Sequence, residues 1–128
     1  MSDPFQTHSA FSWCELQTDD VEKAKTFYSE VIGWEMQEME MPDGTYTVLR
    51  AGDRPVGGIM KNPQGVTGAH WATYVTVDDV DQRIKKAAGA GATVLVEPFD
   101  VPGVGRIAVI ADPTGAAVSL IAYEPQED

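Results

Sequence analysis

The stretch Thr18-Asp19-Asp20-Val21 (TDDV) returns 59 positions later as Val77-Asp78-Asp79-Val80 (VDDV). Each follows a segment of alternating residue character that is typical of a strand, FSWCELQ at 11–17 and HWATYVTV at 70–77. Each also opens a segment whose apolar residues recur at helical spacing and which ends at a glycine. The chain therefore contains two copies of one sequence pattern, an internal repeat.

The first aspartate of each pair is expected to cap its helix. Asp19 has Glu22 three positions later and Asp78 has Asp81, so a capping box can close in both repeats. After each helix the sequence predicts three further strands separated by Gly- and Pro-rich turns. In the second repeat, the turn Asp112-Pro113-Thr114-Gly115 precedes the last of these strands.

Each half is thus predicted as a βαβββ module in the α+β class. A module of this size is too small to bury a good core alone, so the two should share one sheet or pack side by side. The predicted organisation is an N-terminal arm (1–10), a first module (11–61), a linker (62–69), a second module (70–123) and a tail (124–128).

Composition excludes several classes of partner. The 128 residues include nine Lys plus Arg and twenty Asp plus Glu, a formal charge of −11. Such a surface repels phosphate backbones, so nucleic acid and anionic membranes are not expected partners. The sequence lacks the roughly 18–20 consecutive apolar residues of a membrane span and shows no signal-peptide pattern. One cysteine forbids an internal disulfide, and a cytoplasmic location is expected.

The order and spacing of these motifs resemble the vicinal oxygen chelate superfamily, which includes glyoxalases, bleomycin-resistance proteins and extradiol dioxygenases. The resemblance covers residues 11–123 and is closest to the glyoxalase-like branch. The resemblance rests on the motifs Trp13-x-Glu15-Leu16-x-Thr18-x-Asp20, Phe27-Tyr28, Gly33-Trp34, Gly57-Gly58-Ile59-Met60, Val77-Asp78-Asp79-Val80 and Asp112-Pro113-x-Gly115. The resemblance implies that paired βαβββ modules curl into a half-open barrel around a ligand cleft, where the family's enzymes hold a divalent metal.

The residues at the implied metal positions are unsuited to a metal. These positions fall on Trp13, Ala72 and Ser119, and on Gly58 or Met60. Such residues do not replace the His, Glu or Gln ligands of a Zn, Ni or Fe centre. We therefore expect no metal cofactor. The alternative is a metal-dependent lyase, isomerase or dioxygenase whose ligands are displaced along the sequence.

His70 and Glu15 are the catalytic candidates. The pair can act as a general base with a carboxylate that fixes its tautomer, or as a makeshift two-ligand metal site. It can equally be structural, with a half-solvated His70 and with Glu15 accepting hydrogen bonds from neighbouring strands. A metal-free enzyme that uses His70 as base is a further hypothesis.

Strand parity places Trp13, Tyr74, Ser119 and Tyr123 on the side away from the helices, whereas Arg106 is expected at a junction between a loop and a strand. Trp13 and Tyr74 can stack on a planar ligand or fill the interior, and Arg106 can clamp an anion or neutralise the acidic surface. Cys14 has the opposite parity and is expected to be a buried, inert thiol. The candidates for ligand contact are Trp13, Tyr74, Ser119, Arg106, Met60 and Tyr123.

The function favoured by the sequence is binding of a small, partly aromatic or hydrophobic molecule in the cleft. The resemblance supports this reading, because the superfamily's resistance proteins sequester drugs. An acidic surface suits a cationic ligand. A homodimer is expected because the modules have strand edges that are open to pairing.

Overall fold

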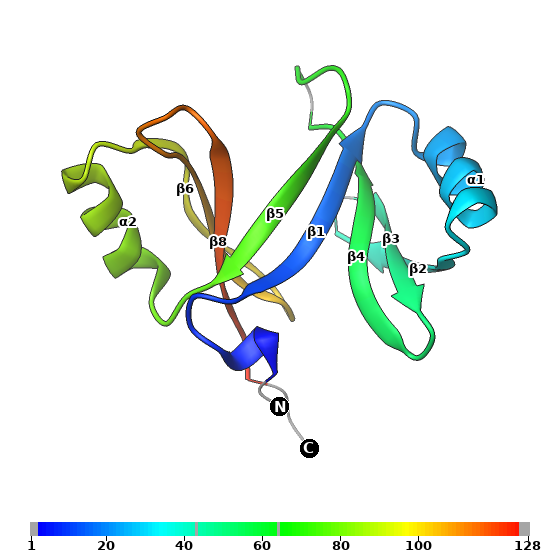
Figure 1. Ribbon diagram of the computed structural model, residues 1–128, viewed down its shortest axis with the longest axis horizontal. Helices are drawn as coiled ribbons and strands as arrows, with labels where there is room; N and C mark the ends of the chain where they lie inside the picture. The colour runs from blue at the N-terminus through cyan, green and yellow to red at the C-terminus, as the bar shows by residue number, and fades with distance from the viewer. Residues whose placement is uncertain (1–2, 43, 64, 126–128) are drawn as a thin grey trace. The chain divides into compact units, whose positions relative to one another are not determined.

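The computed structural model describes residues 3–42, 44–63 and 65–125 (Figure 1). The chain divides into two compact units, which are described separately. The first unit is Trp13–Ala72, and the second unit is Met1–Ser12 together with Thr73–Asp128. No helix among the described residues is long and apolar enough to cross a membrane.

The first unit contains one helix and a four-stranded arrangement. The elements are β1 (Phe11–Thr18), α1 (Val21–Val31), β2 (Glu35–Met41), β3 (Gly44–Ala51) and β4 (Arg54–Lys61). The strand order is β2-β3-β4-β1. β4 is antiparallel to β3 and parallel to β1, as a βαβββ module requires.

The second unit repeats this pattern. A short 3-10 helix, η1 (Pro4–Gln6), precedes β5 (His70–Thr76), α2 (Val80–Gly89), β6 (Thr93–Val101), β7 (Gly105–Ala111) and β8 (Ala117–Tyr123). The first three residues of β5, 70–72, belong to the first unit. The strand order is β5-β8-β7-β6, with β8 parallel to β5 and antiparallel to β7. The prediction of two βαβββ modules in the α+β class is confirmed.

The helix caps lie one residue later than expected. Asp20 accepts a hydrogen bond from the backbone N of Lys23 at 3.0 Å, and Asp79 accepts one from Gln82 at 3.1 Å. The prediction that the first aspartate of each pair is the cap was therefore wrong.

Each first aspartate is engaged elsewhere, which is the physical reason for this shift. The Asp19 carboxylate accepts from Asn62 Nδ2 at 2.9 Å and from the backbone N of Gly68 at 3.0 Å, and these bonds hold the pKa of Asp19 below its ordinary value. Asp78 forms a bidentate ion pair with Arg83, with both N–O distances at 2.9 Å, and this guanidinium lowers the pKa of Asp78.

The two helices are covered to different extents. α2 buries Val80 and Ile84 in a cluster that includes Ala108, Ile110 and Leu120. α1 has no fully buried residue, although it flanks a smaller buried cluster of Leu16, Leu49 and Ile59. The second unit therefore has the better-developed core.

Cys14 is exposed, so the expectation of a buried thiol was wrong. The parity argument was sound, because Leu16, on the same face of β1, is buried next to the α1 residues Val21 and Ala24. Cys14 is two residues earlier on the strand, where this packing has ended.

Residues 3–10 are hydrogen-bonded to the end of β5 within the second unit. The backbone N of Ser9 donates to Thr76 O at 2.7 Å, and the backbone N of Thr76 donates to Ala10 O at 2.8 Å. The Thr76 hydroxyl donates to Pro4 O at 2.8 Å, and His8 Nδ1 accepts from the backbone N of Asp78 at 3.0 Å. The segment is held by main-chain bonds at Ser9 and Ala10 and by the Thr76 side chain at Pro4.

The unequal cores generate a prediction about stability. Ile84→Ala should lower the free energy of unfolding by about 2–5 kcal/mol, because it leaves a cavity in the α2 cluster. Urea denaturation measures this change. Leu95→Ala, at a side chain that is 52% exposed, is the control and should change stability by no more than about 0.5 kcal/mol. Equal effects of the two substitutions would contradict the assignment of the core.

Candidate functional site

The inner face of each unit, defined as the sheet face opposite its helix, carries most of the predicted site residues. In the second unit, strand register aligns inner-face residues into two rows that cross β5, β8, β7 and β6. The first row is Tyr74, Ser119, Val109 and Val96, and the second row is Thr76, Ile121, Ile107 and Phe99. Neither row contains a charged side chain.

Exposure increases along both rows toward β6. Ser119 is 4% exposed and Ile121 2%, whereas Val96 is 42% and Phe99 43% exposed. β6 is the last strand of the order in this unit. The inner face of the second unit is therefore apolar and most accessible at the edge strand.

The inner face of the first unit carries a polar network instead. The indole Nε1 of Trp13 donates to Tyr46 Oη at 3.0 Å, and Tyr46 Oη donates to Glu15 Oε2 at 2.7 Å. Gln17 Nε2 donates to the other carboxylate oxygen of Glu15 at 3.0 Å. Glu15 is only 6% exposed, and each of these hydrogen bonds offsets part of the cost of burying its carboxylate.

Gly58 makes room for this network. It is the register partner of Glu15 on the adjacent strand, and the Tyr46 ring and hydroxyl lie over it. A Cβ at position 58 would collide with both the ring and the hydroxyl of Tyr46. The missing side chain of Gly58 is thus a condition for the contact between Tyr46 and Glu15.

Two other candidates of the first unit differ in exposure. His70 is exposed and is the first residue of β5, while Met60 is half-buried and is the register partner of Gln17. The roles proposed from the sequence for His70, Glu15, Trp13 and Met60 stay predictions.

Arg106 is held by two carboxylates of the second unit. Its Nε and Nη2 donate to Asp81 at 2.8 and 3.1 Å, and its Nη1 donates to Asp100 at 3.1 Å. These bonds raise the pKa of Arg106 and lower the pKa of Asp81. The guanidinium therefore neutralises part of the acidic surface, and its use as an anion clamp would require exchange of these partners.

Tyr123 borders a cavity of about 210 Å³ in the second unit, which Phe5, His8 and Asp78 also line. Its hydroxyl lies 2.7 Å from Ser12 Oγ, and the Phe5 ring meets the Tyr123 ring edge-on at 4.9 Å. Burial raises the pKa of the Tyr123 phenol.

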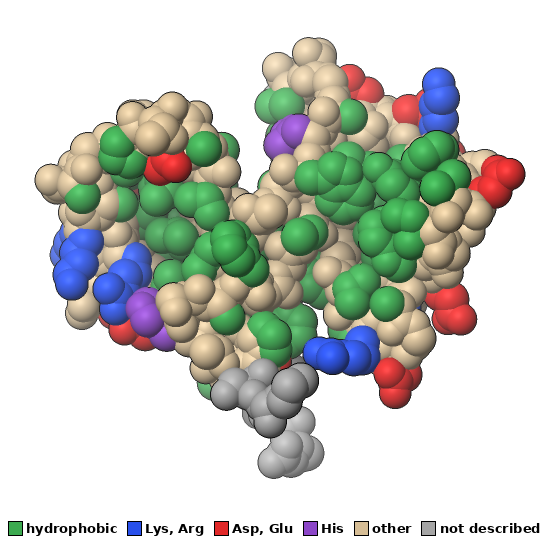
Figure 2. All heavy atoms as spheres, viewed as in Figure 1, with side chains coloured by type: hydrophobic (Ala, Val, Ile, Leu, Met, Phe, Trp, Pro, Cys, Tyr) green, Lys and Arg blue, Asp and Glu red, His purple; other side chains and the backbone are tan. Residues whose placement is uncertain are grey.

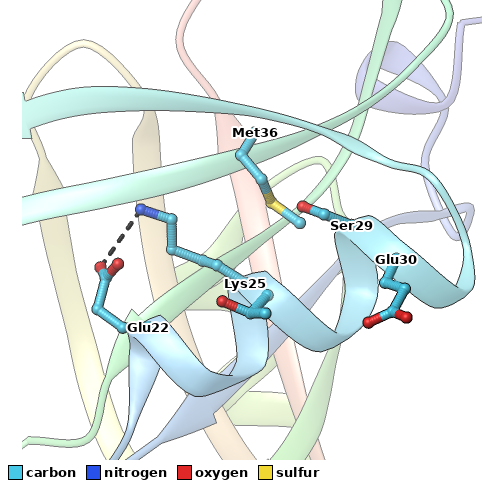
Figure 3. A pocket seen from close by; sticks show the side chains of 6 residues that line it. Glu22, Lys25, Ser29, Glu30 and Met36 are labelled. Atoms are coloured by element: carbon cyan, nitrogen blue, oxygen red, sulfur yellow. Dashed lines mark hydrogen bonds and ion pairs between the residues drawn. The ribbon is translucent and has the colours of Figure 1, made fainter.

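A larger hollow of about 490 Å³ lies along the outside of α1 in the first unit (Figure 3). Lys25 crosses it and forms ion pairs with Glu22 and with Glu38 of β2. Its remaining lining residues are Thr26, Ser29, Glu30 and Met36. None of the residues singled out from the sequence as site candidates lines this hollow.

The side chains at the implied metal positions do not fit a divalent metal. Indole N–H is only a donor, alanine and glycine side chains offer no ligand atom, and a serine hydroxyl or a thioether is a weak ligand for such ions. Within residues 3–42, 44–63 and 65–125, no three His, Cys, Asp or Glu side chains lie close enough together to hold a metal ion.

Sequence reasoning missed Tyr46, Val96 and Phe99. Tyr46 was signalled only by its strand parity together with the absence of a side chain at Gly58. Proline has no backbone N–H to donate to a strand ladder, so Pro98 argues against a strand that continues to Phe99. β6 continues to Val101 because it is an edge strand with shifts in register on both sides of Val96, which accommodate the proline.

The comparisons with known proteins agree with this architecture. Residues 10–120 match the model of the Glyoxalase/Bleomycin resistance protein/Dioxygenase superfamily, and the chain belongs to that family. Methylmalonyl-CoA epimerase from Mycobacterium tuberculosis has the same fold, with a TM-score of 0.69, 15% identity and coverage of 94% of this chain and 92% of that chain.

Two curated relatives are more similar in sequence. A Mycobacterium tuberculosis protein named "Putative glyoxylase CFP32" is 46% identical over 116 residues, which are 90% of this chain and 44% of the relative. The Anthracycline biosynthesis protein DnrV of Streptomyces peucetius is 32% identical over 124 residues, covering 85% of this chain and 45% of the relative. The chain spans less than half the length of these relatives.

The fit of Tyr46 over Gly58 generates a second prediction. Gly58→Ala should lower the free energy of unfolding by about 1–3 kcal/mol, because the added methyl group displaces the Tyr46 ring. In a Tyr46→Ala background the same substitution should cost little, since its collision partner is gone. Urea denaturation of the four proteins in this double-mutant cycle measures the coupling.

Gly89→Ala is the matched control for that cycle. A Cβ at position 89 meets nothing within 4 Å, and the backbone there is not left-handed. This substitution should be neutral or stabilising by up to about 1 kcal/mol. Equal costs of Gly58→Ala with and without Tyr46 would show that the ring does not lie over Gly58.

Proposed function

We propose that this chain binds a small, partly aromatic or hydrophobic molecule against the inner face of its second unit, without the catalytic metal of the family. The observation that carries the proposal is the pair of uncharged rows that end in the exposed side chains of Val96 and Phe99. In this proposal Tyr74 and Ser119 lie at the buried end of the first row.

The apolar face favours a ligand of this chemistry. A molecule that covers Val96 and Phe99 removes apolar surface from water, which contributes about 25 cal/mol per Å². An aromatic ring can also stack on Phe99, and the hydroxyl group of Ser119 is a polar group of the first row that can orient the ligand. A net charge of −11 favours a cationic over an anionic ligand.

The proposal that the chain holds no resident metal rests on the donor set rather than on the fold. Trp13, Ala72 and Ser119 stand where the resemblance implies metal ligands, and these residues supply no imidazole or carboxylate. Glu15, the buried carboxylate nearby in sequence, is hydrogen-bonded to Tyr46 and Gln17.

The names of the relatives support two candidate functions. The relative named for anthracycline biosynthesis supports an aromatic ligand. The relative named as a glyoxylase, which is more similar, supports the second candidate, a metal-dependent lyase or isomerase with displaced ligands that include His70 or Glu15. We further propose that the chain acts in the cytoplasm.

Metal content separates these two candidates. Protein purified without a metal-affinity column, incubated with Zn²⁺, Ni²⁺ or Fe²⁺ and then desalted, should retain far less than one equivalent of each metal because its inner faces lack a ligand set. Elemental analysis by mass spectrometry measures this. Retention of one equivalent that is lost in Glu15→Gln or His70→Ala would refute the metal-free proposal and support the lyase.

Ligand binding tests the apolar face directly, with the fluorescent anthracycline daunorubicin as a planar cationic probe. Phe99→Ala should weaken binding by roughly tenfold, because an aromatic contact and its buried area contribute more than about 1 kcal/mol. Fluorescence anisotropy gives the dissociation constants.

Leu95→Ala is the matched control, since Leu95 is similarly exposed on the same strand but has no partner in the β6–β7 register. It should bind daunorubicin as the unmodified chain does. The proposal for this face fails if daunorubicin does not bind, or if both substitutions weaken binding equally.

A further inference from the structure

A continuous apolar surface lies on the flank of α1 in the first unit. Four aromatic rings form a chain of contacts: Phe27 to Tyr28 at 5.0 Å, Tyr28 to Trp34 at 5.4 Å, and Trp71 to Tyr28 and Trp34 at 5.5 and 6.0 Å. Val31 extends this surface, because it is one helical turn after Phe27. We call Phe27, Tyr28, Val31, Trp34 and Trp71 the α1 patch.

The side chains of the α1 patch are more exposed than the large apolar side chains on the corresponding helix of the second unit. Phe27 is 53%, Val31 61% and Trp71 39% exposed. α2, the corresponding helix of the second unit, buries two of its residues, whereas α1 buries none. Figure 2 shows hydrophobic side chains gathered on the first unit beside α1. Contiguous apolar surface of this kind marks interaction sites.

We propose that the α1 patch is a homodimer interface, in which α1 packs antiparallel against α1 of a second copy across a two-fold axis near Phe27. In such a contact the same patch is used by both copies, so Phe27 and Val31 of one copy cover those of the other. Exposed aromatic side chains supply the anchors that interface cores favour.

Charge on the same helix supports the choice of a second copy as the occupant. Lys23 and Glu30 border Phe27, four residues before it and three residues after it. Both are exposed, and neither makes an ion pair within the part of the chain that the structure describes, unlike Lys25. In an antiparallel pair centred between them, Lys23 of each copy meets Glu30 of the other, which gives two symmetric ion pairs.

The β2 edge is a poorer route to self-association than α1. β2, the edge strand of the first unit, carries Glu35, Glu38 and Glu40, so pairing with itself would bring like charges together. β6, the edge strand of the second unit, has shifts in register that interrupt its ladder. The helix flank is apolar and has its own complementary charges.

Sedimentation velocity of the full chain across a range of micromolar concentrations tests the proposal. The unmodified chain should sediment at twice the 13.9 kDa chain mass. Phe27→Ala should weaken dimerisation, and Lys23→Glu or Glu30→Lys should each raise the dissociation constant by about tenfold or more, because each creates two like-charge contacts. The double variant Lys23→Glu/Glu30→Lys should restore association.

Lys85→Glu, which reverses an exposed charge on α2, is the matched control and should dimerise as the unmodified chain does. All substitutions are at exposed positions, and far-UV circular dichroism checks that the fold is kept. The proposal is overturned by a monomer at every concentration, by a dimer that is insensitive to Phe27→Ala and to both single charge reversals, or by a double variant no better than the single ones.

Discussion

The Tyr46 hydroxyl, held between the Trp13 indole and the Glu15 carboxylate, is the contact on which the inner face of the first unit depends. It places a neutral donor against a buried anion, and it exists only because position 58 has no side chain. The phenol donates directly to the carboxylate and the indole donates to the phenol oxygen, so the two rings stabilise the buried carboxylate by hydrogen bonding.

The second unit shows how the same module acquires a different surface. Its inner face replaces the buried polar network with two uncharged rows, in which Ser119 is surrounded by Val109 and Tyr74 as register partners. Register keeps these side chains on one face, while α2 covers the opposite face and buries Val80 and Ile84 there. The module's backbone is thus constant, and residue choice at alternate positions decides between a polar and an apolar face.

Strand parity and the repeat were sufficient to predict the two modules and to separate Glu15 from Leu16 and Ser119 from Leu120. Features that depend on tertiary partners were not predictable in this way. The capping aspartates shifted by one residue because Asp19 and Asp78 bond to Asn62 and Arg83. Cys14 is exposed because helix packing stops short of it, and Phe99 was missed because Pro98 concealed the continuation of an edge strand.

The proposal of a metal-free chain with an apolar binding face is tested most directly by a crystal structure of the chain grown with daunorubicin and Zn²⁺. We expect the aromatic rings of the probe to lie against Phe99 and Val96, and the Tyr46 hydroxyl to remain hydrogen-bonded to Glu15. A zinc ion coordinated by Glu15 or His70, with Tyr46 turned away from Gly58, would contradict it.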